Sequence, residues 1–328
     1  MDDGKVLITG ACGFLGNLLA THLALYHRNL ILLDHSPPPS NPVPDAEYVT
    51  GDVADAKLLE SVITADVHRI YHLAALASSG SEANYELGLR ANVDGTRAII
   101  KRCKDMGHCP RLVFSSSVAV YGPLPASIVE GVDGETKFTD TTTAFPQSSY
   151  GTQKLISELL INDATRRGFV DGRCLRLPTI VVRPGSPNTA ASSFCSSIIR
   201  EPLKGETAVC PVDPSWPLFM QSPRTVVRNL THAMSIESLK GNERAITLPG
   251  FTTTPKEMVE ALGEVGGDTK LVIWERDPVI EKIVYSWPGF VDTPFANSLG
   301  FHVDKSMKDI VTAYIEDNKT DVKRLNAK

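Results

Sequence analysis

Short apolar runs alternate with longer amphipathic stretches through the first half of the chain. The apolar runs have the length and composition of buried strands, and they occupy residues 5–9, 29–33, 48–53, 69–73, 111–114 and 173–177. Helical periodicity marks the stretches at residues 17–26, 54–63, 82–106 and 147–167. Strands alternating with helices in this way predict an α/β fold built on a doubly wound parallel sheet.

The pattern changes after residue 185, where helical runs lie near residues 194–203, 224–236, 255–263 and 306–317. We therefore expect residues 1–185 to form a nucleotide-binding domain and residues 186–328 to form mainly a smaller substrate-binding domain. Some segments of the second part are expected to return to the main sheet, so a single boundary is an approximation.

Composition excludes several function classes. Hydrophobic residues make up 42% and charged residues 22% of the chain, as in ordinary globular proteins. A net charge of -5 gives no basic footprint for nucleic acid or an anionic membrane surface. No apolar run is long enough for a membrane span, and no secretory signal pattern precedes the first strand. The six cysteines and the histidines show no metal-ligand spacing. We expect a cytoplasmic protein with free thiols and no metal.

The first predicted strand runs directly into a glycine-rich turn, Gly10-Ala11-Cys12-Gly13-Phe14-Leu15-Gly16. Between a strand and a helix, such glycines permit a tight turn, close approach of the backbone to a pyrophosphate, and close packing of the helix on the strand. The phosphates would lie at the helix N-terminus, where unpaired N–H groups favour an anion. Cys12 lies in this turn; its thiol could have a lowered pKa near the helix terminus, or it could be a small residue that merely fits.

Asp34 ends the second predicted strand. An acidic residue roughly 20 positions beyond the glycine turn can accept hydrogen bonds from both ribose hydroxyls of the adenosine. The same carboxylate repels a 2′-phosphate, and the next residues are His35, Ser36 and three prolines, without an arginine. This pattern favours NAD over NADP.

Two further strand ends carry candidate cofactor contacts. Asp52 and Val53 follow the third strand; Asp52 could meet the adenine amino group or could cap the helix predicted at residues 54–63. Leu73, Ala74 and Ala75 follow the fourth strand, and the small alanine side chains would let a cofactor lie close.

A serine cluster, Ser115-Ser116-Ser117, ends the fifth strand, where ligands bind in open α/β sheets. Tyr150 and Lys154 are four apart and therefore share one helix face. A lysine ammonium beside the phenol favours the phenolate, which could then act as a general base. Lowering the phenol pKa by about 3 units requires roughly 4 kcal/mol, so a second cation such as an oxidised nicotinamide is expected to contribute. A Tyr-x-x-x-Lys pair on a solvated helix face is the alternative interpretation.

Together these motifs resemble one family. The glycine turn, Asp34, residues 51–53, His72-Leu73-Ala74-Ala75, Asn92, the serine cluster and Tyr150-x-x-x-Lys154 are similar in order to an extended short-chain dehydrogenase/reductase of the NAD-dependent epimerase/dehydratase group. The resemblance implies that Tyr150 is the catalytic acid/base, that Lys154 lowers its pKa and binds the nicotinamide ribose, and that Ser117 hydrogen-bonds the reacting oxygen. It places Asn92 in a relay beneath the lysine; a packing residue inside the helix is the alternative.

The implied cofactor contacts can be collected from these motifs. They are Gly10, Gly13, Phe14, Leu15, Gly16, Asp34, Asp52, Val53, Leu73, Ala74, Ala75, Asn92, Ser115, Tyr150, Lys154, Pro178 and Ile180. Pro178 and Ile180 would border the nicotinamide. The resemblance also implies a homodimer in which the helices around residues 83–106 and 150–167 pair across a two-fold axis.

The second half departs from sugar-nucleotide epimerases, which usually carry an aromatic-Asn pair followed by Gly-Pro after the sixth strand. It is instead similar to D-erythronate dehydrogenases at residues 169–185, 190–194, 198–203, 209–212, 222–224, 248–250 and 287–289. That family oxidises the C2 hydroxyl of a four-carbon sugar acid and passes the hydride to NAD.

A small hydroxy acid requires a cation for its carboxylate, and arginine provides a planar, two-pronged donor. Arg183, Arg200 and Arg224 lie in the segments expected on the substrate side, although each could instead form a structural ion pair. Ser192 could donate to a substrate hydroxyl or cap the following helix. With Ser117 and Tyr150, these are the expected substrate contacts.

The sequence therefore predicts an NAD-dependent dehydrogenase that acts on a small sugar acid, with D-erythronate as first choice. Two alternatives remain at this stage: an epimerase or dehydratase that uses NAD transiently, and a non-catalytic protein that senses NAD.

Overall fold

The computed structural model describes residues 4–40, 42–123, 137–186, 190–239, 241 and 243–323. The chain divides into two compact units. The first comprises Met1–Val120, Pro146–Arg176 and Val227–Ile246, and the second comprises Tyr121–Phe145, Leu177–Val226 and Thr247–Lys328. The second unit thus begins before the expected boundary at residue 185, and one later segment belongs to the first unit.

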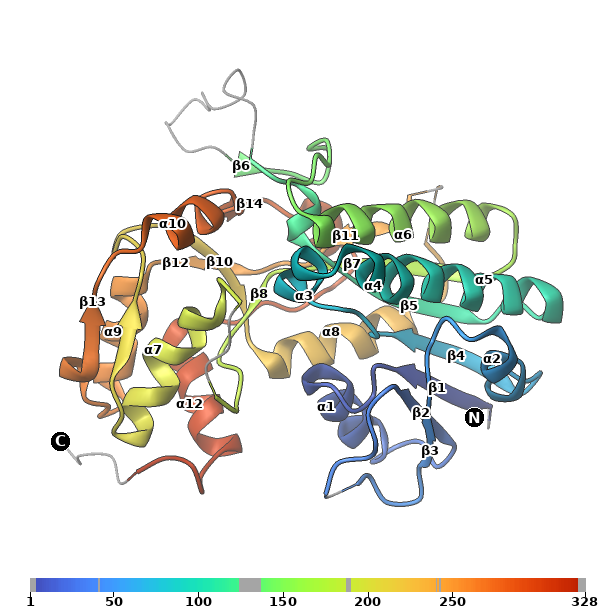
Figure 1. Ribbon diagram of the computed structural model, residues 1–328, viewed down its shortest axis with the longest axis horizontal. Helices are drawn as coiled ribbons and strands as arrows, with labels where there is room; N and C mark the ends of the chain where they lie inside the picture. Colours follow the sequence, from blue (N-terminus) through green and yellow to red (C-terminus); the bar gives the residue numbers. More distant parts are fainter. Residues whose placement is uncertain are drawn as a thin grey trace. The chain divides into compact units, whose positions relative to one another are not determined.

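A seven-stranded sheet forms the centre of the first unit, in the order β11-β7-β5-β4-β1-β2-β3 (Figure 1). The pairs β3–β2, β2–β1, β1–β4 and β4–β5 run parallel. The strands are β1 (Lys5–Thr9), β2 (Leu30–Asp34), β3 (Glu47–Thr50), β4 (Val67–His72), β5 (Arg111–Ser117), β7 (Asp171–Leu177) and β11 (Ala245–Thr247). The chain order reverses between β1 and β4, and ligands bind at the carboxyl ends of strands at such a point.

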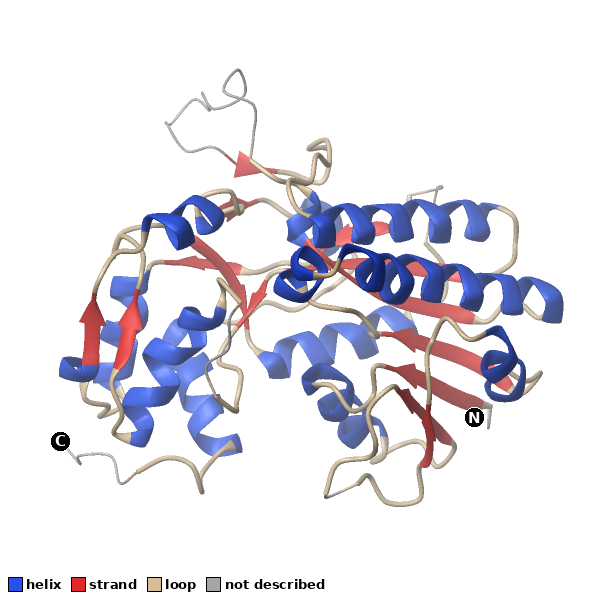
Figure 2. Cartoon of the chain, viewed as in Figure 1, coloured by secondary structure: helices blue, strands red, loops and turns tan. Residues whose placement is uncertain are grey.

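Helices cover both faces of this sheet, which confirms the doubly wound fold (Figure 2). Figure 1 shows α4 (Tyr85–Leu89), α5 (Gly95–Met106) and α6 (Ser149–Arg166) on one side, with α1 (Phe14–Leu23) and α8 (Pro223–Ser235) on the other. The central strands are apolar along their whole length because both of their faces are covered. Their buried side chains include Leu7, Ile31, Ile70, Leu112 and Phe114.

The helix predicted at residues 82–106 differs from the expectation. Asn84 separates α3 (Ser78–Ala83) from α4, and its side chain accepts a hydrogen bond from Leu87 N at 3.0 Å. A π-helix, η1 (Arg90–Asp94), then precedes α5. The interruption of the predicted helix therefore occurs at Asn84 and in η1. A π-turn inside a helix often marks a functional site, and Asn92 lies within it.

The described residues of the second unit form three small sheets and several helices. Its sheets are β12-β10-β8, β13-β9 and β14-β6, built from β6 (Lys137–Phe138), β8 (Thr179–Ile180), β9 (Ala208–Cys210), β10 (Leu218–Gln221), β12 (Phe251–Thr253), β13 (Val272–Trp274) and β14 (Phe290–Val291). Its helices include α7 (Ser193–Lys204), α9 (Pro255–Glu264), α10 (Pro278–Val284), α11 (Pro294–Ser298) and α12 (Met307–Asp317). Its own apolar core includes Val181, Ile198, Met220, Leu262 and Val311.

The helical runs predicted after residue 185 are confirmed as α7, α8, α9 and α12. All six cysteines are free, as expected. Among the described residues, no helix combines the length and apolarity needed to cross a bilayer.

Candidate active site

The glycine turn lies at the switch point between β1 and β4. Gly10 has a φ of 71°, and a Cβ on it would lie 2.6 Å from the backbone nitrogen of Ala74. A Cβ on Gly16 would overlap the backbone oxygen of Gly10. The turn is therefore closed to larger side chains at both positions. Gly13 precedes α1 without any side-chain cap, so the residues present fit a pyrophosphate at this helix N-terminus.

The Asp34 side chain is hydrogen-bonded to the backbone of the same turn. Its side chain is 8% exposed, and its carboxylate accepts hydrogen bonds from Cys12 N and Ser36 N, each at 2.9 Å. Each carboxylate oxygen has more than one lone pair, so the group retains capacity for ribose hydroxyls. Burial, together with the charge of Asp34, raises the pKa of Cys12. This direction is opposite to the lowered pKa considered for the thiol, because burial and the Asp34 charge both disfavour the thiolate.

Asp52 does not cap the next helix, so that alternative is wrong. Helix α2 (Ala56–Val62) is capped by Asp55, whose side chain accepts from the backbone nitrogens at positions 57 and 58. The Asp52 carboxylate instead pairs with Arg90 Nε of η1 at 2.7 Å. Val53 is buried beside it. The contact of Asp52 with adenine stays a prediction.

A buried histidine joins the ends of β1 and β4. Thr9 pairs with His72 in the sheet register, and Thr9 Oγ1 lies 2.7 Å from His72 Nδ1. On the other side, His72 Nε2 lies 3.0 Å from Thr96 Oγ1, whose hydroxyl donates to the carbonyl of Asn92 at 2.9 Å. Since Thr96 donates its hydrogen elsewhere, it must accept from His72, so Nε2 carries the proton and Nδ1 accepts from Thr9. Burial, with the nearby Lys154 charge, lowers the pKa of His72 to about 3, so the ring is neutral.

The same network positions the predicted cofactor contacts that follow β4. Leu73 N donates to the carbonyl of Thr9 at 3.1 Å, and Ala74 N donates to Thr9 Oγ1 at 3.3 Å. Ala75 is exposed. The structure therefore brings Leu73 and Ala74 against the glycine turn, and their contact with the cofactor stays a prediction.

Tyr150 and Lys154 lie in the first turns of α6, whose N-cap is Ser148. Lys154 is 1% exposed; its Nζ donates to the carbonyl of Ser115 at 2.7 Å and lies 5.6 Å from the centroid of the Tyr150 ring. No described residue hydrogen-bonds the Tyr150 hydroxyl. The Tyr-x-x-x-Lys motif is therefore not on a solvated face: the lysine is buried against the serine cluster.

The pKa values of Tyr150 and Lys154 indicate that the pair requires a further positive charge to form a phenolate near neutral pH. Burial raises the pKa of Tyr150 to about 12. Burial also lowers the pKa of Lys154 to about 7, an effect that Glu158 and Cys174 oppose. A lysine with this pKa is only partly charged near neutrality, so it cannot by itself bring the phenol into the range of a general base. A further positive charge beside the phenol, such as that of an oxidised nicotinamide, would supply the rest.

Ser117 and Asn92 have different surroundings. Ser117 Oγ accepts from Ala119 N at 3.1 Å, which leaves its hydroxyl hydrogen available for another acceptor. Asn92 is 1% exposed and fully bonded: its side chain accepts from Leu76 N at 2.8 Å and donates to Gln153 Oε1 at 2.7 Å. Its carbonyl also accepts from Ser157 Oγ at 2.8 Å. These contacts make Asn92 a packing link between η1 and α6, and its part in a proton relay stays a prediction.

A buried ion pair beside Lys154 was missed by sequence reasoning. Glu158 is 4% exposed, and Arg176 NH2 donates to its Oε2 at 2.7 Å. Ser116 Oγ donates to the same carboxylate. The available signals were the spacing of Glu158, four residues after Lys154 on α6, and a charged residue inside the apolar strand β7.

The substrate-side candidates belong to the second unit, where the structure brings three of them together. Arg183 NH2 donates to Ser192 Oγ at 3.1 Å, and Arg200 NH1 donates to the carbonyl of Arg183 at 2.7 Å. Arg200 is buried and pairs with Glu201 at 2.7 Å. No carboxylate among the described residues pairs with Arg183. Burial lowers the pKa of Arg183, yet a guanidinium remains charged.

The other second-unit candidates are placed as follows. Arg224 is half-exposed and forms ion pairs with Glu316 at 2.9 Å and Asp317 at 2.6 Å. Pro178 is buried, and Ile180 lies in β8, where it pairs with Gln221 of β10.

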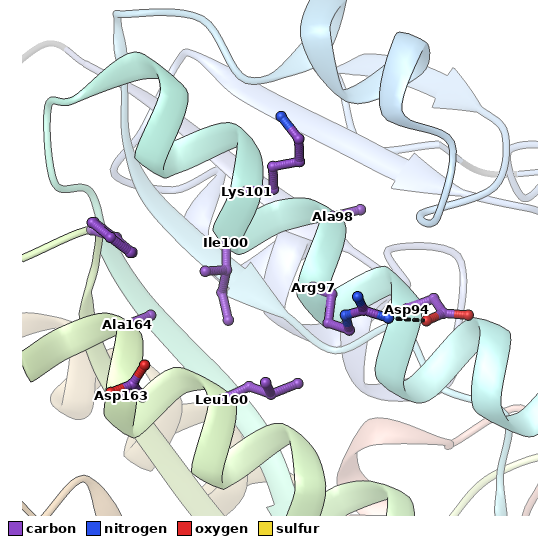
Figure 3. Close-up of a pocket in the computed structure, with 9 residues that line it drawn as sticks. Asp94, Arg97, Ala98, Ile100, Lys101, Leu160, Asp163 and Ala164 are labelled. Carbon is purple, nitrogen blue, oxygen red and sulfur yellow. Dashed lines mark hydrogen bonds and ion pairs between the residues drawn. The ribbon is translucent and has the colours of Figure 1, made fainter. Parts of the chain in front are cut away.

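A shallow surface pocket lies between α5 and α6, and it contains none of the predicted site residues (Figure 3). It is lined by Asp94, Arg97, Ala98, Ile100, Lys101, Leu160, Asp163, Ala164 and Phe169. Arg97 and Lys101 lie among Asp94, Asp163 and several apolar side chains, a mixture typical of an outer helix surface.

Comparisons with known proteins agree with this arrangement. The model of the NAD dependent epimerase/dehydratase family matches residues 6–234. A D-erythronate dehydrogenase of Cupriavidus necator is 44% identical over 95% of this chain and 98% of its own length. A second protein of that name, from Haemophilus influenzae, is 43% identical over 95% of this chain and 99% of its own.

A solved structure of a nucleoside-diphosphate-sugar epimerase from Agrobacterium tumefaciens superposes with a TM-score of 0.89 at 35% identity, covering 97% of this chain and 95% of that one. The family match and the named dehydrogenases imply a nicotinamide cofactor, which the glycine turn fits. With the motif order, the fold and the match over more than half its length, this chain belongs to the NAD dependent epimerase/dehydratase family.

Proposed function

We propose that this protein oxidises the C2 hydroxyl of a short sugar acid with NAD, and that D-erythronate is its substrate. One observation carries the catalytic part of the proposal. Lys154 is buried beside Tyr150 and bonded to the serine cluster at the carboxyl end of β5. This arrangement provides a tyrosine base, a cation and a hydroxyl donor within the unit that contains the glycine turn.

Asp34 supports NAD as the cofactor. Its carboxylate lies beside the glycine turn, where it can accept from the two ribose hydroxyls and repel a 2′-phosphate. No arginine follows it in the next three positions, so this segment offers no guanidinium to a 2′-phosphate.

The reaction divides among three side chains. When bound, NAD supplies an oxidised nicotinamide that accepts hydride. Tyr150, as phenolate, removes the proton of the C2 hydroxyl while the C2–H bond loses its hydride, so the carbon becomes a carbonyl. Lys154 stabilises the phenolate, and Ser117 donates its free hydroxyl hydrogen to the substrate oxygen throughout.

Arg183 supports an acid as the substrate. Among the three candidate arginines, Arg200 is neutralised by Glu201 and Arg224 by two carboxylates. Within the described part of the chain, the Arg183 guanidinium instead donates to the carbonyl and hydroxyl oxygens of Ser192. A half-buried guanidinium that has no carboxylate partner among the described residues is suited to bind the carboxylate of a ligand. We therefore assign the substrate carboxylate to Arg183, with Ser192 orienting the guanidinium.

The two rival functions make different demands on the site. An epimerase acting on a nucleotide sugar has no carboxylate to place on Arg183, although the Agrobacterium structure carries that name. A protein that only senses NAD has no need of a phenol held beside a buried lysine. The names of the two relatives that are 44% and 43% identical over 95% of this chain also favour the dehydrogenase.

Apolar side chains on the outer helices support the proposed homodimer. Leu87, Ile156 and Leu159 are 48%, 36% and 63% exposed on α4 and α6. An apolar stripe on paired helices is typical of an interface between copies. Equilibrium sedimentation would show a species of twice the chain mass if α5 and α6 pair across a two-fold axis.

Formation of NADH tests the function. Purified protein is mixed with NAD and, separately, D-erythronate, L-threonate, D-threonate or a UDP-sugar. Reduction of NAD with D-erythronate, and its loss by orders of magnitude in Tyr150→Phe with NAD affinity retained, is the expected result. Conversion of the UDP-sugar without net NADH would replace the proposal with the epimerase alternative.

A further inference from the structure

Glu158 is the central residue of a buried polar cluster beneath the catalytic pair. Arg176 donates to its carboxylate through Nε at 3.0 Å and through NH2 at 2.7 Å, so the pair is two-pronged. Ser116 Oγ donates to Oε1 of the same carboxylate. All three side chains are nearly excluded from solvent. A fold seldom retains a buried ion pair for stability alone, since apolar replacements are often as stable.

The cluster is connected to both parts of the catalytic arrangement. On α6, Glu158 lies one turn beyond Lys154 and two turns beyond Tyr150, on the same helix face. On β5, its partner Ser116 lies between Ser115, whose carbonyl receives Lys154 Nζ, and Ser117. The Glu158 carboxylate therefore anchors Ser116, the residue of β5 that lies between Ser115 and Ser117.

The charged and titratable groups around Lys154 come from three elements. Helix α6 provides Tyr150 and Glu158, strand β4 provides His72, and strand β7 provides Cys174 and Arg176. Burial keeps the thiol of Cys174 and the ring of His72 neutral by raising the pKa of the first and lowering that of the second. Among the described residues, Glu158 is therefore the negative charge that acts on the lysine.

We propose that Glu158 is a positioning residue of the reaction, whose carboxylate favours the ammonium form of Lys154 and, through Ser116, aligns the strand that carries Ser117. The inference rests on the proposed roles of Tyr150 and Lys154. Arg176 has a supporting part, because its two-pronged hydrogen bonds hold the Glu158 carboxylate in place against Ser116.

The test is the pH dependence of kcat/KM in Glu158→Gln. The glutamine keeps an acceptor for Ser116 and removes the charge, so Lys154 loses its proton at lower pH and Tyr150 ionises at higher pH. The acid limb of the profile should move up by roughly half to one pH unit. Activity near neutral pH should fall and should recover in part at alkaline pH.

Two further variants separate this effect from a loss of stability. Glu158→Gln deprives the buried Arg176 of the Glu158 carboxylate, whereas Glu158→Gln with Arg176→Met removes both charges; the double variant should regain thermal stability while its acid limb stays displaced. Asp171→Asn is the matched control, because Asp171 pairs with buried Arg173 at the opposite end of β7. Asp171→Asn should lower stability without shifting the acid limb of the kcat/KM profile.

Titration of Tyr150 gives a readout that needs no turnover. The ultraviolet absorbance of phenolate is followed in each background with NAD bound, and the contribution of Tyr150 is the difference from the matching Tyr150→Phe protein. In Glu158→Gln, that phenol should ionise at higher pH. Equal titration curves and an unmoved acid limb would overturn the inference for Glu158 and leave the proposed function intact. A wild-type protein that reduces NAD with no acid would instead overturn the proposed function.

Discussion

A Cβ on Gly151 would overlap the backbone oxygen of Ala119, two residues after Ser117. The N-terminus of α6 therefore packs directly on the turn η2 (Val118–Val120) that follows β5. Tyr150 precedes Gly151 in the chain, and Ser117 precedes the turn. Close backbone contact thus sets the spacing of the elements that carry the proposed base and the proposed hydroxyl donor.

Gly151→Ala should consequently reduce kcat by at least about tenfold while leaving NAD affinity unchanged. The methyl group must push α6 away from the turn, and a displacement of about 1 Å can cost up to about 100-fold in rate. Steady-state kinetics and NAD titration measure the two effects. Gly168→Ala, just beyond the other end of α6 with open space around it, should cost stability through its φ of 71° but retain kcat. Equal loss of activity in both variants would contradict the spacing argument.

The Asp34 carboxylate should decide between the two nicotinamide dinucleotides. In Asp34→Ser, two hydrogen bonds to the ribose and the repulsion of a 2′-phosphate are lost together. Hydrogen bonds to charged groups are worth about 1.5–3 kcal/mol each, so the preference for NAD over NADP in kcat/KM should fall by roughly 100-fold. Asp66→Asn, a surface carboxylate paired with Lys5 at the opposite end of the sheet, is the control. An unchanged preference in Asp34→Ser would remove this residue from cofactor selection.

Arg183 should carry most of the affinity for the acid. Replacing Arg183 by methionine removes the cation assigned to the carboxylate, and KM for D-erythronate should rise by about 100-fold, since one charged hydrogen-bonded pair contributes about 3 kcal/mol. NAD affinity should stay as in the wild type. Arg224→Met provides the comparison, because that side chain is half-exposed and paired with two carboxylates. A large effect of Arg224→Met on KM, with little effect of Arg183→Met, would reverse the assignment.

Acid should destabilise the protein through His72. Its pKa is lowered from 6.5 to about 3 in the folded state, so the unfolded chain binds more protons across that window. The stability contribution of the neutral ring is fully present above pH 6.5 and is lost as pH falls towards 3, at up to about 1.4 kcal/mol per pH unit.

His72→Gln tests this contribution in denaturant unfolding at neutral and acidic pH. The variant should be less stable at neutral pH, because the hydrogen bonds of the His72 ring to Thr9 and Thr96 are lost. Its stability should decline less on acidification. Parallel loss of stability in the two proteins would show that the buried ring does not titrate on unfolding.

Much of the fold follows from local sequence pattern. Apolar runs gave the strands β1, β2, β4, β5 and β7, because strands buried on both faces tolerate few polar residues. The glycine turn and Asp34 were predictable because their chemistry depends on position at a strand end, which the pattern of elements determines. The i to i+4 spacing likewise placed Tyr150 and Lys154 on one face of α6.

Partner choice between distant charged groups was not predictable in the same way. Two aspartates, Asp52 and Asp55, compete near the start of α2, and only the fold shows that Asp55 caps it while Asp52 pairs with Arg90. From sequence alone, Arg200 and Arg224 are equally plausible substrate-binding residues. Their ion pairs with Glu201, Glu316 and Asp317 appear only in the structure. The raised pKa of Cys12 also depends on Asp34, which lies 22 residues away in sequence.

Transfer of hydrogen from C2 tests the central claim most directly. The protein is mixed with NAD and D-erythronate deuterated at C2, and the masses of the reduced cofactor and the product are determined. We expect one deuterium in the NADH and an unlabelled 2-keto acid, because the hydride leaves C2 as Tyr150 takes the hydroxyl proton. Unlabelled NADH with deuterium retained in the product would place the oxidation at another carbon, and the absence of NADH would contradict the dehydrogenase itself.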